Sequence, residues 1–393
     1  RGGFMIIHKH KLPQKTTGLD FWPILPQSFN LGTGSGQARY AGVPGLVRGF
    51  EIAHRLYGKL PWVDIIKPSI VLARLGFRPL PSLITMVSLV SELKGSLYDM
   101  LHPNNSVLKE STILYNIALA RTLESVALRG SQELYDGLLT PSIVKQLEEY
   151  GSQITMSDFN AYNVTSSDLI RTGMDHTTLY TIGSPSSGGL LMSLLKVIVQ
   201  KNQTLGINKP LNLMEEMKQL YMKYSVPGVG SSGATVVGTD TEELDVVFSG
   251  GLGSPFGSGV MTKEGLVVND ALRGVSDNHL EPLTSLIVIM GIEKELCGRR
   301  TLLGGTDLGY TLTRSLPVLL KKSFFPHLPV TYKLLPPNVI RIPNVEGRNT
   351  TTFWNELLNT TSLELEEDSK PFNIGIIEKV SDKLEVIFET NKH

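Results

Sequence analysis

Apolar residues recur at helical spacing through most of the first half of the chain. In residues 46–58 they line one face of a helix that ends at Gly58. Thr155 followed by Asp158 is typical of a helix N-terminus, with the acid in the first turn. Similar patterns predict helices over residues 61–75, 82–101, 111–128, 141–150, 190–199 and 211–224. The first 225 residues are therefore expected to be mainly helical.

Strand patterns frame this helical region. Residues 4–8 and 19–22 predict a hairpin, the glycine-rich residues 32–45 a loop, and residues 179–182 a short strand. Later strands are predicted at 234–237, 244–248, 266–268, 286–290, 301–303, 339–342, 372–378 and 384–389. Helices are expected again at residues 308–320 and 351–358. This order predicts an α+β fold in which helices cover stacked sheets.

The charge and composition exclude several classes of protein. The 393 residues include 37 Lys+Arg and 37 Asp+Glu, so the net charge is zero, which gives no basic footprint for nucleic acid. The chain is 41% hydrophobic, which suits a folded core, yet no apolar run reaches the ~18–20 residues that span a bilayer. Cys297 is the one cysteine, so internal disulfides and cysteine-rich zinc sites are excluded.

Glycosylation sequons indicate an extracellular or secreted protein. Five Asn-x-Ser/Thr sequons occur, which is more than about three expected by chance, and their asparagines are Asn104, Asn163, Asn202, Asn349 and Asn359. The sequence begins at Arg1 rather than Met. We therefore expect that an N-terminal segment, with any targeting signal or membrane anchor, has been removed.

Several common motifs carry no function here. The Gly-x-Gly-x-Gly run at 32–36 lacks the strand and the Gly-Lys-Ser/Thr of a phosphate loop. His8 and His10 alternate on a strand without a third ligand nearby, so we expect an exposed strand and no metal. The acidic stretches 240–245 and 364–368 are expected to be an exposed turn and a solvated loop. We expect no cofactor.

Small and hydroxyl residues stand beside several of the predicted strands. Ser231 and Ser232 precede one strand, Thr284 and Ser285 precede another, and a Gly-Gly-Thr run at 304–306 follows a third. A hydroxyl at the head of a strand can attack the preceding carbonyl and release itself as a new N-terminus, whose amine then acts as its base. Neighbouring glycine N–H groups can stabilise an oxyanion. On spacing alone, these segments are equally compatible with ordinary turns.

In this order, the segments resemble the γ-glutamyltranspeptidase (glutathione hydrolase) family. The similarity rests on stretches 43–54, 57–62 and 68–77, on Pro-Ser-Ser-Gly-Gly at 185–189, on Phe-Gly-Ser at 256–258, and on the glycine pair. It implies an N-terminal-nucleophile hydrolase fold, an αββα four-layer sandwich. It also implies a mostly helical large-subunit-like region at 1–230, truncated at its N-terminus, and a strand-rich small-subunit-like region at 231–393. Family members cleave themselves before a threonine, which transfers a γ-glutamyl group from glutathione.

This sequence departs from the family pattern at the expected site. Ser231 stands at the nucleophile position and Thr235 follows within the same motif. Trp22 replaces the arginine that holds the substrate carboxylate. Asp270 remains as one acid near the site of the substrate amine, but the second acid is lost and Arg273 would repel an ammonium group. The resemblance implies substrate-contacting roles for these retained residues: Thr284, Ser285, Gly304 and Gly305.

These departures predict a family member with little or no glutathione hydrolase activity. One alternative is an active hydrolase or transferase with an N-terminal serine, Ser231, and altered specificity. Another is a secreted, non-enzymatic binding or decoy protein whose pocket Trp22 fills or lines. Glutathione or other γ-glutamyl compounds are the expected ligands if the site is active. The chain is expected to be a monomer, or a heterodimer of its own two fragments.

Overall fold

The computed structural model describes 2–32, 35–174, 177–205, 232–240, 244–275, 286–293, 300–306, 308 and 311, and the strands at 333–335, 339–343, 364–368, 373–380 and 383–390. The expected helices at 211–224 and 351–358, and nearly all of the one at 308–320, lie outside these residues, as does Cys297. None of the described helices has the length and apolarity needed to cross a bilayer.

Two antiparallel sheets form the centre of the molecule. The first has the order β3-β2-β1-β7-β6, with bounds β1 Gly2–Lys9, β2 Lys15–Asp20, β3 Thr165–Ser167, β6 Ser232–Thr239 and β7 Leu244–Gly253. The second has the order β14-β13-β9-β8-β5-β4, with bounds β4 Leu169–Met174, β5 Thr177–Ile182, β8 Ile287–Glu293, β9 Arg300–Gly305, β13 Asn373–Val380 and β14 Lys383–Thr390. A separate small sheet joins β10 Lys333–Leu335, β11 Val339–Pro343 and β12 Glu364–Asp368.

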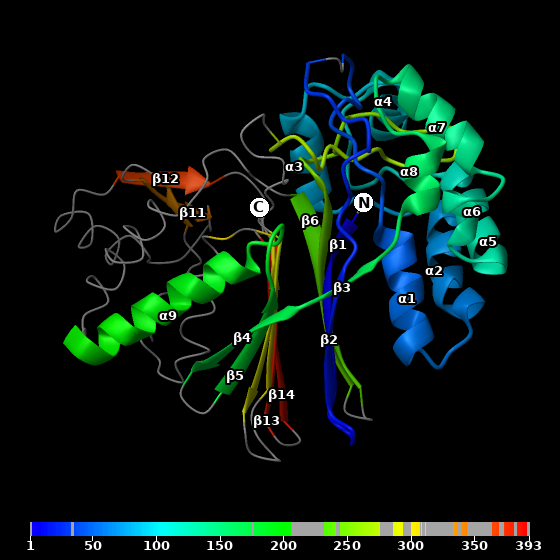
Figure 1. The fold of residues 1–393 in the computed structure, drawn as a ribbon. Coiled ribbons are helices and arrows are strands. Elements are labelled where there is room, and N and C mark those ends of the chain that lie inside the picture. The colour runs from blue at the N-terminus through cyan, green and yellow to red at the C-terminus, as the bar shows by residue number, and fades with distance from the viewer. Residues whose placement is uncertain are drawn as a thin grey trace.

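Alternating apolar residues pack the two large sheets face to face. Phe4 and Ile6 of β1 point toward the second sheet, where they meet side chains such as Val288 and Met290. The intervening Met5 and Ile7 point the other way, onto the α1 side. A period of two along a strand buried on both faces produces this division. Figure 1 shows the sheets side by side at the centre of the fold.

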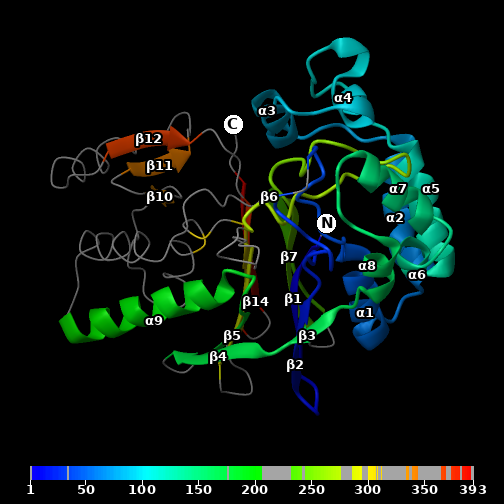
Figure 2. The ribbon, with the colours of Figure 1, turned by 45° about the horizontal axis from the view of Figure 1, so that its top comes forward.

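Helices cover both outer faces of this pair of sheets. The described helices are α1 Leu46–Tyr57, α2 Trp62–Leu75, α3 Pro81–Leu89, α4 Gly95–Leu101, α5 Ile117–Arg129, α6 Gln132–Tyr135, α7 Thr140–Glu149, α8 Met156–Ala161 and α9 Gly188–Leu205. A short 3-10 turn, Pro103–Asn105, follows α4. α1 packs on the first sheet and α9 on the second, as Figure 2 also shows. The α+β, four-layer prediction is confirmed.

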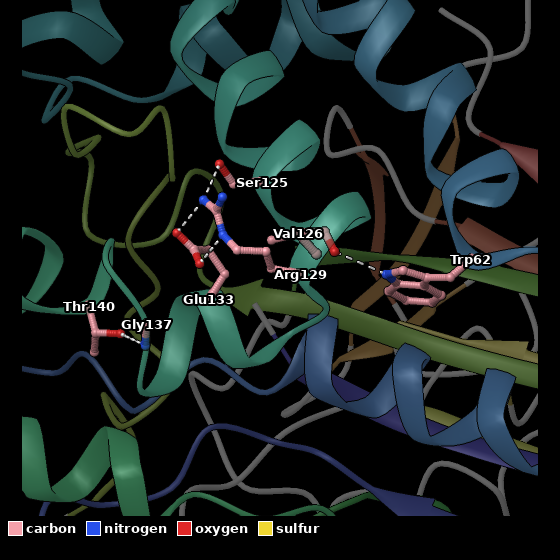
Figure 3. Close-up of polar contacts among 7 residues, drawn as sticks. All are labelled: Trp62, Ser125, Val126, Arg129, Glu133, Gly137 and Thr140. Carbon is pink, nitrogen blue, oxygen red and sulfur yellow. Dashed lines mark hydrogen bonds and ion pairs between the residues drawn. The ribbon is translucent and has the colours of Figure 1, made fainter.

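Polar contacts hold the helical layer together (Figure 3). Arg129 of α5 donates from Nε to a carboxylate oxygen of the buried Glu133 of α6 at 2.7 Å, and from a terminal nitrogen to the other oxygen at 2.8 Å. The Trp62 indole N–H donates to the Val126 carbonyl at 3.2 Å and ties α2 to α5. A buried carboxylate needs such partners, because leaving it unpaired carries a large desolvation cost.

Some predicted elements differ from the structure. The helix expected at 82–101 is two helices, α3 and α4: the backbone is extended at Val90 and Lys94, and the Lys94 N–H bonds to the Gly259 carbonyl before α4 begins at Gly95. The strand expected at 266–268 is reduced to one bridge, Met261 with Val267. The acidic stretch 364–368 is not a loop, since its backbone pairs in parallel with β11.

The sequence pattern predicts that His8 and His10 lie on an exposed strand. Both side chains are instead buried, His8 in β1 and His10 just after it. His10 Nε2 lies 2.5 Å from Oδ2 of Asp245, which is also buried rather than part of an exposed turn. His8 Nδ1 lies 2.7 Å from Thr16 Oγ1. In the described part of the chain, no group of three His, Cys, Asp or Glu residues is placed to hold a metal. These side chains therefore close one end of the inter-sheet core with polar contacts.

Candidate functional site

The start of β6 defines the place expected for a nucleophile. β6 begins at Ser232, directly after Ser231, and pairs with β7 through an irregularity between Ser232 and Gly233. Ser231 itself lies outside the described residues, as do Thr284 and Ser285. The domain boundary expected at 230 lies in the same undescribed stretch. The roles of these residues stay predictions.

The glycine pair lies in the second sheet against the inner face of β6. Gly304 and Gly305 end β9, between β8 and β13. A Cβ added at Gly304 would lie 2.3 Å from Cγ2 of Thr235, so a side chain at 304 would collide with the Thr235 methyl group. The glycine at 304 is therefore required by packing.

Two hydroxyl groups and one backbone carbonyl form a chain of polar contacts between the sheets. The Ser249 hydroxyl donates to the Gly305 carbonyl at 3.0 Å, and it lies 3.4 Å from the Thr235 hydroxyl. Thr235 is three residues beyond Ser232, about 10 Å along the strand. The structure thus places Thr235 where it supports the glycine pair, and a catalytic role for it stays a prediction.

Trp22 lies between the two sheets and is only 3% exposed. Its ring stacks on Phe4, with centroids 5.8 Å apart and planes 14° apart, and it belongs to a buried cluster with Ala271 and Leu286. Ala271 directly follows Asp270 in the sequence, so Trp22 packs beside the segment that carries the retained acid. Among the described residues, the indole nitrogen has no hydrogen-bond partner although it is buried. Trp22 therefore fills this space with an apolar ring and an unsatisfied donor.

Asp270 is buried and both of its carboxylate oxygens have partners. Oδ1 accepts the Ser254 N–H at 2.7 Å, and Oδ2 accepts from Nε of Arg273 at 2.8 Å. Asp270 is 2% exposed, while the Arg273 side chain reaches toward solvent. Next to it, Asn269 bonds to the backbone of Gly42 in both directions and fixes the loop. The Asp270 carboxylate is thus already paired with a cation of the same chain, Arg273.

Asp20 is a titratable neighbour of this site that the sequence pattern does not reveal. It ends β2, and its Oδ1 accepts the backbone N–H of Trp22 at 2.9 Å. Burial raises the pKa of Asp20 to about 6, although the hydrogen bond from Trp22 opposes the shift. The only sequence signal is the spacing of Asp20 and Trp22, because residues two positions apart on an extended chain point to the same face.

The described glycosylation sequons lie at the surface. Asn104 and Asn163 are exposed, and Asn104 sits in a turn with a positive φ of 56°. Asn202 lies in α9, while Asn349 and Asn359 lie outside the described residues.

Comparisons with known proteins identify the family and the fold. The model of the family described as Gamma-glutamyltranspeptidase matches residues 2–226, more than half of the chain. The chain belongs to this family. Glutathione hydrolase 5 proenzyme of Rattus norvegicus is 32% identical over 212 residues, which cover 49% of this γ-glutamyltranspeptidase-family chain and 37% of the rat protein. A glutathione hydrolase of Aspergillus flavus is 30% identical over 207 residues, 50% of this chain and 34% of that protein. The match thus spans about a third of the length of these relatives.

A solved structure supports the fold over nearly the whole chain. The cephalosporin acylase of Bacillus halodurans superposes with a TM-score of 0.78, covering 99% of this chain and 85% of its own, at 14% sequence identity. At that identity the likeness concerns the fold alone. The N-terminal-nucleophile hydrolase architecture predicted for this γ-glutamyltranspeptidase-family chain is confirmed.

Proposed function

We propose that this chain is a γ-glutamyltranspeptidase-family protein with little or no glutathione hydrolase activity. The observation that carries the proposal is Trp22, a buried ring where the family resemblance implies a guanidinium group. An indole has one N–H donor and no charge, so it cannot replace a bidentate arginine–carboxylate pair.

The second support is the ion pair that Asp270 already makes with Arg273. Its Oδ2 accepts from Arg273, and its Oδ1 accepts from the Ser254 backbone. A substrate ammonium group would have to displace Arg273 and would meet its positive charge. Removing one partner of a buried charge pair costs roughly 2–5 kcal/mol. Losing both ionic contacts to an α-amino acid head group would lower transition-state binding on the order of 10³-fold or more.

An active hydrolase with altered specificity is the alternative that one observation favours. Gly304 and Gly305, to which the resemblance gives substrate-contacting roles, are retained, and Gly304 lies against Thr235 of β6, the strand that begins directly after Ser231. In that mechanism the Ser231 hydroxyl adds to the Gly230 carbonyl, the C–N bond breaks, and the resulting ester is hydrolysed by water. The freed α-amine of Ser231 then accepts the hydroxyl proton in each acyl transfer.

Two measurements test the proposal. After deglycosylation, we expect intact mass and a denaturing gel to show one chain with no cut before Ser231; residues 1–393 account for 43.1 kDa of it. We also expect γ-glutamyl-p-nitroanilide turnover to be near background and the same in Ser231→Ala. Self-cleavage with turnover that Ser231→Ala abolishes would establish the active alternative. An uncleaved chain that binds glutathione would instead support the non-enzymatic binding protein.

We also propose that the protein is secreted or extracellular and carries N-linked glycans. The exposure of Asn104 and Asn163 supports this, because a glycosyl group needs an accessible asparagine. Expression in secreting cells should give a product whose mass falls on treatment with an N-glycosidase. A product of unchanged mass would contradict glycosylation.

A further inference from the structure

The outer side of α2 and the segment beside its C-terminus expose an unusual amount of apolar surface. Seven large side chains there are 40–69% exposed: Ile65, Val71, Leu72, Leu75, Phe77, Ile113 and Tyr115. We call these seven residues the α2 surface. With about half of each side chain open, their area is on the order of 600 Å², at the upper limit of the largest apolar patch on a typical monomer.

These residues form one continuous surface. On α2, Val71 and Leu75 are one turn apart and lie opposite the buried Ala73, while Leu72, which follows Ile65 by two turns, extends the exposed surface along the adjoining side of the helix. A Cβ added at Gly76, the residue that ends α2, would lie 2.5 Å from Ile113 and 2.8 Å from the Tyr115 ring.

The two backbone bonds between Phe77 and Leu114 continue this surface beyond the helix. Phe77 donates to Leu114 at 3.0 Å, and Leu114 donates back at 2.9 Å. Leu114 is buried, so its neighbours 113 and 115 are turned outward beside Phe77. α2 itself lies on the far side of α1 from the first sheet, as Figures 1 and 2 agree. The α2 surface therefore lies away from the sheets.

Two exposed basic residues adjoin the α2 surface although the chain as a whole is neutral: Lys67 lies one turn before Val71 on α2, and Arg78 follows Phe77. From residue 55 to residue 80 the sequence has five basic residues and one acid, Asp64, in the first turn of α2. Arg74 pairs with Glu124 of α5. The other four basic side chains are exposed: Arg55, Lys59, Lys67 and Arg78. This net charge disfavours a second copy of the same surface, because like charges would meet across the interface.

We propose that the α2 surface docks on an anionic lipid surface. An apolar helix face flanked by lysine and arginine fits the boundary between lipid headgroups and acyl chains, where the apolar residues enter and the cations meet acidic headgroups. Phe77 and Tyr115 are of the type that occupies this boundary. The inference does not depend on catalysis and stands whether or not Ser231 is active.

Vesicle co-sedimentation tests this docking. The full chain is mixed with vesicles of phosphatidylcholine alone, or with about 30% phosphatidylserine, at low and high salt. We expect preferential binding to the anionic vesicles, weakened by salt. Leu72→Glu/Leu75→Glu should abolish it, and Lys67→Gln or Arg78→Gln should each weaken it about five-fold. Leu12→Glu is the matched control, since Leu12 is 88% exposed in the β1–β2 turn, and should leave binding unchanged.

Three results would overturn the proposal. One is no sedimentation of the folded chain with anionic vesicles. Another is equal binding to both vesicle types, or binding that persists in Leu72→Glu/Leu75→Glu. The last is a concentration-dependent dimer that the same double variant abolishes, which would make a second copy the occupant. Circular dichroism melting of each variant verifies that the fold is retained.

Discussion

Arg273 donates from Nε to Oδ2 of Asp270 at 2.8 Å, so this chain supplies its own cation to the one acid retained near the expected site. The acid is buried and the arginine is half-exposed. The pair therefore has the geometry of a competitor that a substrate amine would need to displace. From the sequence, Arg273 is expected only to repel an ammonium group, whereas the structure shows that it also neutralises Asp270.

Restoring both ionic contacts should restore binding of a γ-glutamyl head group. In Trp22→Arg/Arg273→Ala, a guanidinium group becomes available for the substrate carboxylate and Oδ2 of Asp270 becomes available for the amine. We expect glutathione affinity to rise at least about ten-fold over the wild type, by isothermal titration calorimetry. Arg273→Lys is the control, because it keeps a positive charge beside Asp270. Unchanged titration of the folded double variant would contradict the alignment of Trp22 with the family arginine.

The Trp22 ring and its N–H should have opposite effects on stability. Trp22→Ala opens a cavity beside Phe4 and should lower the free energy of unfolding by about 3–5 kcal/mol. Trp22→Phe keeps an aromatic ring but removes the N–H that lacks a partner among the described residues, so it should cost no more than about 1–2 kcal/mol. Urea unfolding of the three proteins measures both. Equal losses of unfolding free energy in the two variants would show that the indole N–H makes a hydrogen bond that contributes as much as the packing of the ring.

Local patterns in the sequence predict most of the described fold. The alternation in β1 places Phe4 and Ile6 on one side, and Thr155 with Asp158 forms the capping box expected at the start of α8. These features depend on neighbours a few residues apart. Periodicity misses the break between Leu89 and Gly95, where the Lys94 N–H bonds to the carbonyl of Gly259, far along the chain.

The polar contacts of the site could be predicted less well. Asp245 pairs with His10 across 235 residues, and no spacing rule connects them. Asp270 and Arg273 are three residues apart, yet sequence alone does not say that one is buried and the other bonded to it. The resemblance places Trp22 at the expected site, but only the fold shows that its ring stacks on Phe4. These contacts depend on which side chains the fold buries and on which distant segments of the chain it brings together.

Asp20 should make the stability depend on pH. Its pKa of about 6 in the folded state exceeds the ordinary 3.8, so between these values the folded state holds a proton that the unfolded state has lost. Stability is therefore lost as the pH rises from about 4 through 6, by about 2–3 kcal/mol in total. Asp20→Asn removes this loss. Urea unfolding should show the variant more stable than the wild type at pH 7.5, with the gain mostly gone at pH 4. A constant difference across this range would contradict the shift.

Gly304 and Thr235 should be coupled through one methyl group. An added Cβ at 304 would lie 2.3 Å from Thr235 Cγ2, whereas its next neighbours, in Val247 and Phe248, lie at 3.4 and 3.5 Å. Gly304→Ala should therefore destabilise the fold by about 1–3 kcal/mol. Thr235→Ser removes that methyl but keeps the hydroxyl beside Ser249, so the Gly304→Ala change should be tolerated in the double variant. A double-mutant cycle from urea unfolding should give a coupling of about 1–2 kcal/mol. Additive effects would mean that the sheets separate to admit the new side chain, and that the close approach here is not fixed by Thr235.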